Sequence, residues 1–220
     1  MLSVVVPTLN AARSLGRTLA SVAGCPVAEI IVADGGSDDG TPQLAASLGA
    51  RVIAAPRGRG AQIAAGVSEA AGPWLLLLHA DTELGADWRR QVAEHMRAGP
   101  ERAAYFRFVL ASDDPRARRL ERLVAWRCRV LALPYGDQGL LVHRDLLRRI
   151  GGVRPLPLME DVDLVRRIGR RRLVPLDVPA VTSAAKWERD GWRRRSLRNL
   201  ACLSLYFARV PPRFIARLYT

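Results

Sequence analysis

The chain has 220 residues, of which 49% are hydrophobic and 25% are charged, values that are typical of a globular protein of one large or two small domains. Its net charge of +13 lies entirely in residues 111–220, which hold 24 basic and 11 acidic residues, whereas residues 1–110 hold ten of each. This composition excludes a disordered chain, and the basic half suits a diphosphate, an anionic acceptor or a membrane surface; nucleic acid is not predicted as a partner, because no nucleic-acid-binding motif is present.

In the first half, short apolar segments alternate with segments of helical spacing. Strands are predicted over residues 2–6, 29–33, 51–55 and 74–78, with Pro7 closing the first. Helices are predicted over 12–23, from Thr41-Pro42 with Thr41 as the N-cap, and over 60–70 and 86–96. This alternation predicts a parallel sheet with right-handed crossovers.

The second half is more varied and more basic. Strands are predicted over residues 104–111, 138–142 and 173–177, the last as an edge strand. Helices are predicted over 116–133, 145–150, 161–172, 191–208 and 212–219. The sequence therefore predicts one continuous α/β sheet, mostly parallel and Rossmann-like, that is flanked by helices and followed by basic C-terminal helices.

The N-terminus and the cysteines indicate a cytoplasmic protein. Cys25, Cys128 and Cys202 are odd in number and lack metal-type spacing, so we expect reduced structural thiols. The first residues form a strand pattern rather than a signal peptide. The longest apolar stretch near the C-terminus, residues 200–208, is shorter than the roughly 20 residues of a spanning helix. We expect no membrane crossing, with peripheral association on the inner face of the membrane as an open alternative.

Asp81 follows a run of four leucines, which is typical of a buried strand. Burying an unpaired carboxylate is costly, so Asp81 should be solvated, paired or bound to a cation. Ligands bind at the carboxyl ends of strands in open α/β sheets, and a magnesium or manganese ion on a diphosphate takes only one or two protein carboxylates. Asp81 is therefore the metal candidate, with a helix cap as the alternative. His79 either faces the nucleotide or packs beneath the loop.

Two further loops carry candidate binding residues. Asp34 stands where the second strand ends, in position to accept hydrogen bonds from a base or a ribose, while residues 37–39 are better explained as caps of the next helix. Arg57 and Arg59 lie on a glycine-rich turn before a helix, an arrangement that suits a diphosphate. The alternative for both arginines is simple solvation.

Residues 158–164, LMEDVDL, open a helix with three acidic residues in its first turn, where acidic residues are favoured in any case. Asp161 and Asp163 are two apart and do not share a helix face, so at most one projects into a cleft. A carboxylate placed there can act as a general base.

Residues 136–139, GDQG, either let an acceptor approach closely or form a turn. Lys186, after the last strand, can neutralise a leaving diphosphate, and Trp187 either stacks on a ligand or packs. These segments complete an ordered set of motifs along the chain.

Together the motifs resemble the family 2 glycosyltransferases of the GT-A fold. The matching segments, in order from residue 2 to about 187, are VVVPTLN, EIIVADGGSDDGT, RGRGAQ, LLLLHADT, GDQG and MEDVDL. A finer resemblance is to the bacterial arsenosugar-biosynthesis-type glycosyltransferases, through HADT, LPYGDQG, PLMEDVDL and a Trp-Glu-Arg segment.

The resemblance implies an inverting, metal-dependent transfer of a sugar from a nucleotide-diphosphate sugar to a hydroxyl acceptor. UDP is the first candidate for the nucleotide. The acceptor stays open, with an anionic or a lipid-linked compound as alternatives. The same resemblance implies a single domain over residues 1–220, with a donor half (1–110), an acceptor half (111–190) and C-terminal helices (191–220). The resemblance also implies that Asp34 binds the nucleobase, that Asp81 binds Mg²⁺ or Mn²⁺, and that Asp161 is the general base. It places Pro7 and Asn10 in the nucleotide pocket, and Asp137 and Gln138 on the acceptor side.

The chain departs from the family pattern at two positions. His79 replaces the first Asp of the usual Asp-x-Asp metal motif, and Lys186 stands where Arg is frequent, so the bidentate fork is lost. A nucleotidyltransferase is one alternative function, although the first loop, PTLNAARSL, lacks the glycine-rich pattern of those enzymes. A non-enzymatic membrane-surface protein is the other, because residues 116–133 and 193–217 are basic and amphipathic; the alternative there is that their apolar faces cover the sheet.

Overall fold

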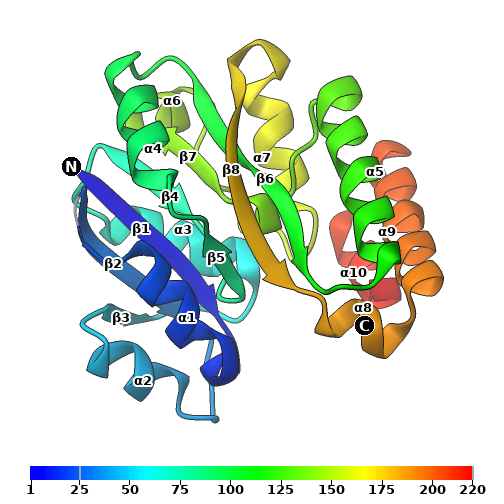
Figure 1. Ribbon diagram of the computed structural model, residues 1–220, viewed down its shortest axis with the longest axis horizontal. Helices are drawn as coiled ribbons and strands as arrows, with labels where there is room; N and C mark the ends of the chain where they lie inside the picture. Colours follow the sequence, from blue (N-terminus) through cyan, green and yellow to red (C-terminus); the bar gives the residue numbers. More distant parts are fainter. Residues whose placement is uncertain (25, 220) are drawn as a thin grey trace.

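The computed structural model describes residues 1–24 and 26–219, so Cys25 and Thr220 lie outside the described residues. In that part of the chain an eight-stranded sheet lies between helices (Figure 1). The strands are β1 (Leu2–Thr8), β2 (Val27–Asp34), β3 (Arg51–Ala54), β4 (Trp74–Leu77), β5 (Thr82–Leu84), β6 (Ala103–Ala111), β7 (Leu140–His143) and β8 (Leu173–Ser183). The helices are α1 (Ala12–Val22), α2 (Thr41–Ser47), α3 (Arg59–Glu69), α4 (Trp88–Arg97), α5 (Pro115–Leu131), α6 (Arg144–Arg149), α7 (Glu160–Ile168), α8 (Ala185–Asp190), α9 (Trp192–Phe207) and α10 (Pro212–Tyr219), with short 3₁₀ turns η1 (Gly136–Gln138) and η2 (Arg170–Arg172).

The sheet is continuous and mixed, with parallel pairs in the majority. Its order is β3-β2-β1-β4-β7-β6-β8-β5. The β3–β2, β2–β1, β1–β4 and β6–β8 pairs are parallel, whereas β7 and β5 run antiparallel to their neighbours. The predicted α/β class is confirmed. This topology brings the ends of β1, β2, β4 and β8 and the start of β7 to one edge of the sheet.

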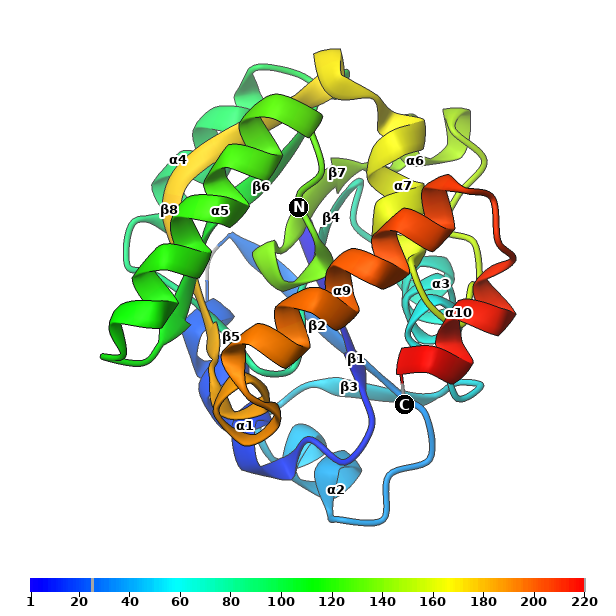
Figure 2. The ribbon, with the colours of Figure 1, turned by 90° about the vertical axis from the view of Figure 1, so that its right-hand side faces the viewer.

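Helices cover both faces of the sheet, which explains why its strands are apolar almost throughout. Along β1, Val4 and Val6 pack under α1, α2 and α4, while Val5 packs under α3, α6 and α7. A third cluster lies between α5 and β6, and a fourth joins α7 to α9 and α10. Figure 2 shows α5, α9 and α10 in front of the sheet on one side of the molecule.

Three predictions for the first half need correction. Pro7 does not close β1, which continues to Thr8. Proline has no N–H to donate, but the Pro7 nitrogen faces β4, which has already ended at Leu77, so the sheet loses no hydrogen bond there. Gly40, with φ 84°, is the N-cap of α2 instead of Thr41. The helix predicted over 86–96 starts at Trp88, and the short strand β5 lies before it.

The second half needs three more corrections. β8 is not an edge strand: it lies between β6 and β5 and runs to Ser183. Two prolines and Asp177 interrupt its apolar pattern, and they are tolerated because β5 pairs only with residues 180–182. Gln138 belongs to η1 and not to a strand. The predicted long helix from Asp161 ends at Ile168, and η2 follows.

The C-terminal segment forms α8, α9 and α10, of which α8 was not predicted. Within the described residues, none of the helices combines the length and the apolar character that a membrane crossing requires. Cys128 and Cys202 are free, buried thiols, as predicted, while the prediction for Cys25 lies outside the described residues.

Candidate active site

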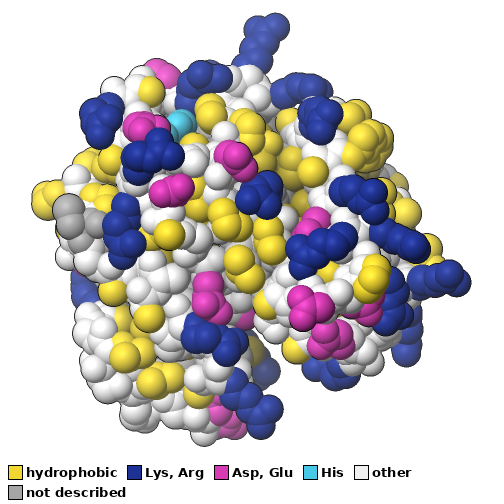
Figure 3. Space-filling model, viewed as in Figure 1, with side chains coloured by type: hydrophobic (Ala, Val, Ile, Leu, Met, Phe, Trp, Pro, Cys, Tyr) yellow, Lys and Arg dark blue, Asp and Glu magenta, His cyan; other side chains and the backbone are white. Residues whose placement is uncertain are grey.

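A cleft opens at the edge where the strand ends meet. Figure 3 shows the surface indented at the lower edge of the view, between the part that holds β1–β3 and the part that holds α5, α8 and α9. The cleft has a volume of about 130 Å³ and is open to solvent. Its lining residues are Arg59, His79, Asp81, Tyr135, Asp137, Leu158, Met159, Asp161, Val162, Thr182, Ser183, Lys186, Trp187, Arg195 and Asn199.

Asp34 is buried and bonded within its own loop instead of lining this cleft. It accepts hydrogen bonds from Thr8 Oγ1 (2.9 Å), from the Gly36 amide (3.0 Å), and from the Ser37 amide (2.8 Å) and hydroxyl (2.6 Å). Burial raises the pKa of Asp34, but these hydrogen bonds outweigh it and hold the pKa below its ordinary value. The carboxylate therefore organises the loop after β2.

Asn10 ties the loop after β1 to the loop after β2. It adopts a left-handed backbone (φ 52°), its amide donates to Ser37 Oγ (2.8 Å), and its side-chain oxygen accepts from the Asp38 amide (3.0 Å). Pro7, just before, lines a small apolar pocket below the cleft together with His79 and Asp161. Asn10 thus ties the two loops together.

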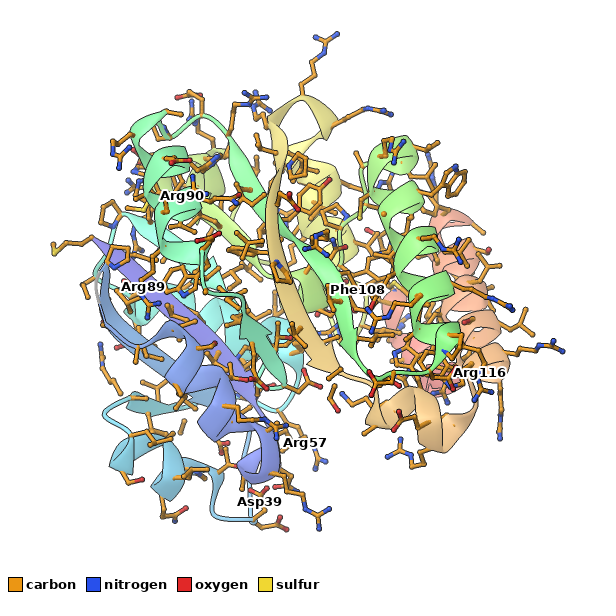
Figure 4. All side chains as sticks on the ribbon, viewed as in Figure 1. Asp39, Arg57, Arg89, Arg90, Phe108 and Arg116 are labelled. Atoms are coloured by element: carbon orange, nitrogen blue, oxygen red, sulfur yellow. The ribbon has the colours of Figure 1, made fainter. Side chains whose placement is uncertain are left out.

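The glycine-rich turn separates its two arginines. Arg57 is exposed, and Figure 4 shows it at the same end of the molecule as Asp39, beyond the strand ends. Arg59 lines the cleft, pairs with Glu160, and lies 3.8 Å from Asp161 Oδ2. Gly60 permits this pairing, because a Cβ there would come within 2.7 Å of the Leu156 carbonyl oxygen.

Asp81 and Lys186 face each other across the cleft. Lys186 Nζ lies 3.5 Å from Asp81 Oδ2, and their side chains are 58% and 24% exposed. The backbone of Asp81 is fixed to β8, since its carbonyl accepts from the Ser183 amide (3.2 Å). Asp81 is thus paired but accessible, as the charge argument requires.

Asp161 lies at the start of α7 with its carboxylate toward η1. Oδ2 accepts from the Gly136 amide (2.9 Å) and Oδ1 from the Val162 amide (2.8 Å). Burial raises the pKa of Asp161, but Arg59, these two amides and His79 together lower it below its ordinary value. Asp163 faces away and pairs with Arg154 and Arg167, so the prediction that only one of these two aspartates enters a cleft is confirmed.

His79 and Asp137 bring buried polar atoms without hydrogen-bond partners to the cleft. These atoms are His79 Nε2 and Asp137 Oδ1. Burial and the charge of Arg59 lower the pKa of His79 to about 4, and burial raises the pKa of Asp137 to about 6. Only glycine fits at position 136, because a Cβ would come within 2.5 Å of His79 Nε2.

Gln138 and Trp187 are held by protein contacts. The Gln138 amide donates to the Phe106 carbonyl (2.9 Å) and accepts from Cys128 Sγ (3.1 Å), and the side chain lies outside the cleft lining. Trp187 lines the cleft but also stacks on Trp192, with ring centroids 6.1 Å apart.

Sequence reasoning missed several residues in and beside the cleft. Glu160 is 2% exposed, pairs with Arg59, and has a pKa that burial raises. Tyr135 lies under the Arg127 guanidinium, 3.4 Å from the ring centroid. Arg195 and Asn199 reach the cleft from α9, a helix whose local sequence gives no such signal.

Solved structures define the class. The fold is that of the GT-A transferases: S. aureus TarS 1–349, also solved with UDP, matches with a TM-score of 0.68 at 16% identity, over 83% of this chain and 60% of that chain. Glucosyl-3-phosphoglycerate synthase of Mycobacterium tuberculosis, solved with Mn²⁺ and UDP-glucose, matches with a TM-score of 0.61 at 20% identity, over 83% of this chain and 71% of that one. At these identities the likeness establishes the fold.

The family follows from the sequence comparisons. The model of glycosyl transferase family 2 matches residues 3–153, more than half of the chain, and the chain belongs to this family. An uncharacterized glycosyltransferase of Mycobacterium tuberculosis is 31% identical over 189 residues, which cover 84% of this chain and 80% of that protein. A PGL/p-HBAD biosynthesis glycosyltransferase of the same species is 39% identical over 93 residues, so this chain spans only 36% of its length.

Proposed function

We propose that the protein transfers a sugar from a UDP-sugar to a hydroxyl acceptor, with inversion at the anomeric carbon. The observation that carries the proposal is that two of the three carboxylates in one cleft lie beside a basic side chain, Asp81 beside Lys186 and Asp161 beside Arg59. A single displacement needs one group at the leaving diphosphate and another at the attacking hydroxyl. The UDP of TarS and the UDP-glucose of the mycobacterial synthase support a UDP-linked donor.

In the proposed mechanism, residues 1–220 form a single domain whose three segments have different roles. Residues 1–110 supply the loops after β1 and β2 for the nucleotide, with Asp34 shaping the loop that meets the base. Residues 111–190 supply Asp161 and Asp137 on the acceptor side, and residues 191–220 close the cleft with α9.

Asp161 is suited to the base role by its charge and its free lone pairs. Its lowered pKa keeps it ionised at neutral pH, and each oxygen accepts one backbone hydrogen bond, which leaves a second lone pair for a hydroxyl proton. Glu160 holds Arg59 beside it and so fixes the direction of the carboxylate. The acceptor oxygen then attacks the face opposite the diphosphate while Asp161 takes its proton.

The residues present fit a divalent ion. No group of three His, Cys, Asp or Glu side chains that could hold a metal is found among the described residues, but Mg²⁺ and Mn²⁺ beside a diphosphate need only one or two carboxylates. Asp81 would hold the ion, which when bound would neutralise charge on the leaving diphosphate. Lys186 supplies a second positive charge at the same place, and the neutral His79 avoids repelling either.

The test is a thermal-shift series with UDP-, GDP- and dTDP-glucose, each with and without Mn²⁺. A ligand at 100 times its Kd stabilises the fold by about 2.7 kcal/mol. We expect the largest shift with UDP-glucose and Mn²⁺, and the Mn²⁺-dependent part should disappear in Asp81→Asn but persist in the matched control Asp87→Asn, an exposed carboxylate near α4. If none of the three donors raises the melting temperature, the proposal is overturned.

Transfer itself is tested by product analysis. With an accepted hydroxyl compound, release of UDP supports a glycosyltransferase, and release of pyrophosphate would support the alternative nucleotidyltransferase. NMR of the product reports the anomeric configuration; net retention would replace the single displacement and would point to Asp137 as a nucleophile. The arsenosugar subgroup stays a prediction, since neither relative described above carries that description.

A further inference from the structure

α5 has apolar side chains on two opposite faces. Its inner face packs on β6 through Ala117, Val124 and Cys128, all buried. Its outer face carries Leu123, Trp126 and Val130, which are 63%, 56% and 41% exposed and are spaced by three and four residues. Core packing explains the first face and leaves the second without a partner among the described residues.

α9 and α10 repeat this arrangement. On α9, Cys202 and Leu203 are buried, whereas Leu197 and Leu200 are 67% and 59% exposed. On α10, Ile215 is fully buried, and its neighbours point outward. We call the large exposed apolar residues of the three helices the outer helix face: Leu123, Trp126, Val130, Leu131, Leu197, Leu200, Phe207, Phe214 and Leu218.

The three helices lie on one side of the molecule, in front of the sheet in Figure 2. They carry twelve arginines and a single acidic residue, Glu121. Arg119 and Arg122 on α5 and Arg193 and Arg194 on α9 are exposed beside the apolar side chains. Arg116, at the start of α5, marks the lower end of this side in Figure 4.

Helices with an apolar stripe that arginines flank bind the interface of anionic bilayers, where the apolar side chains enter the headgroup region and the arginines meet phosphate groups. We propose that the outer helix face docks on an anionic lipid bilayer. A second copy of the chain is a poor occupant, because two such faces would bring the exposed arginines of one copy, such as Arg119, Arg122 and Arg193, against those of the other.

Docking would also place the cleft close to the lipid. The inner side of α9 contributes Arg195 and Asn199 to the cleft, and its opposite side belongs to the outer helix face. One helix diameter, about 10 Å, therefore separates the cleft from the bilayer surface. The surface lies outside the cleft, and its test measures binding alone, so its outcome is independent of the proposed sugar transfer.

The experiment is flotation of the full chain with phosphatidylcholine vesicles that contain or lack phosphatidylglycerol. We expect binding only with phosphatidylglycerol, and binding should weaken as salt is added. The Trp126→Ser/Leu197→Ser variant should bind at least about tenfold more weakly. Each of Arg119→Glu and Arg193→Glu should weaken binding about fivefold or more.

Matched controls are Leu48→Ser, a leucine 49% exposed directly after α2, and Arg97→Glu, an exposed arginine on α4, both of which should bind like the parent. Circular dichroism of each variant shows that it is folded. Absence of binding to the anionic vesicles, or equal binding by the double variant, overturns the proposal. A dimer in light scattering that Trp126→Ser dissolves would assign the face to a second copy instead.

Discussion

Two regions at the same edge of the sheet differ in how far their polar groups are hydrogen-bonded. In the loops after β1 and β2, the polar groups satisfy one another: Asp34 accepts four hydrogen bonds, and Asn10 both donates and accepts. In and beside the cleft, buried polar atoms of four side chains have no hydrogen-bond partner in the described structure. They are His79 Nε2, Asp137 Oδ1, Glu160 Oε2 and Asn199 Oδ1.

This difference in hydrogen bonding distinguishes the loops that support the site from the cleft itself. An unsatisfied buried polar group costs roughly 1–3 kcal/mol, a cost that a ligand can remove by supplying the missing partner. The closed network after β2 has no such cost and holds the backbone in one conformation. Substitutions in the network should therefore change stability first, and substitutions in the cleft should change activity first.

Asp161→Asn should give the largest effect. Loss of a general base lowers kcat by about 10²–10⁴-fold, while donor binding, read by thermal shift with UDP-glucose and Mn²⁺, should change little. Asp163→Asn, two residues away, is the matched control. It breaks the pair with Arg167, which is largely buried, and the pair with Arg154, which is 58% exposed. It should destabilise the fold by about 3–5 kcal/mol while the kcat of the folded enzyme stays unchanged. A folded Asp161→Asn protein with normal kcat would remove this residue from the mechanism.

Asp34→Ala should act mainly on stability. It leaves two amides and two hydroxyls without their acceptor, and we expect a loss of about 3–4 kcal/mol in urea unfolding at neutral pH. The native pKa of Asp34 is lowered, so its contribution is present above the ordinary Asp pKa and is lost as pH falls through the native value. The difference between parent and variant should shrink in acid. Unchanged stability with lost UDP affinity would instead assign Asp34 to the base alone.

Asp137→Asn should stabilise the protein. Burial raises the pKa of Asp137 from 3.8 to about 6, so between these values the native state keeps a proton that the unfolded state releases. Stability from this group therefore falls as pH rises through the window, and the cost at about pH 7 is on the order of 2–3 kcal/mol. Asparagine removes the charge, so the variant should gain that amount at neutral pH and nothing near pH 4. Equal melting temperatures at both pH values would contradict the shift.

The sequence predicts the fold better than the cleft. Buried strands such as residues 74–78 are visible because two covered faces require continuous apolar runs, and strand direction then brings residues 34, 81 and 183 to one edge. β8 was predicted only over residues 173–177, and as an edge strand, because Asp177 and Pro179 interrupt the apolar pattern. The strand continues to Ser183, where residues 180–182 pair with β5.

The cleft depends on contacts that no local pattern encodes. Glu160 reaches Arg59 across 101 residues, and Asp81 meets Lys186 across 105. The role of Gln138 in bonding Phe106 is equally non-local. Periodicity reports which side chains are buried, but the partner of each charge is fixed only when α3 packs on α7 and when α8 meets the loop after β4.

Lys186→Met should have the smallest effect on stability and a selective effect on catalysis. Its pair with Asp81 is 3.5 Å long and more than half exposed on the lysine side, so its loss should cost less than about 1 kcal/mol of stability. If Lys186 neutralises the leaving diphosphate, kcat should still fall about 10-fold or more, because the charge develops in the transition state. Lys186→Arg should restore most of the rate. A variant that loses neither rate nor donor affinity would leave Asp81 as the sole charged contact at this end of the cleft.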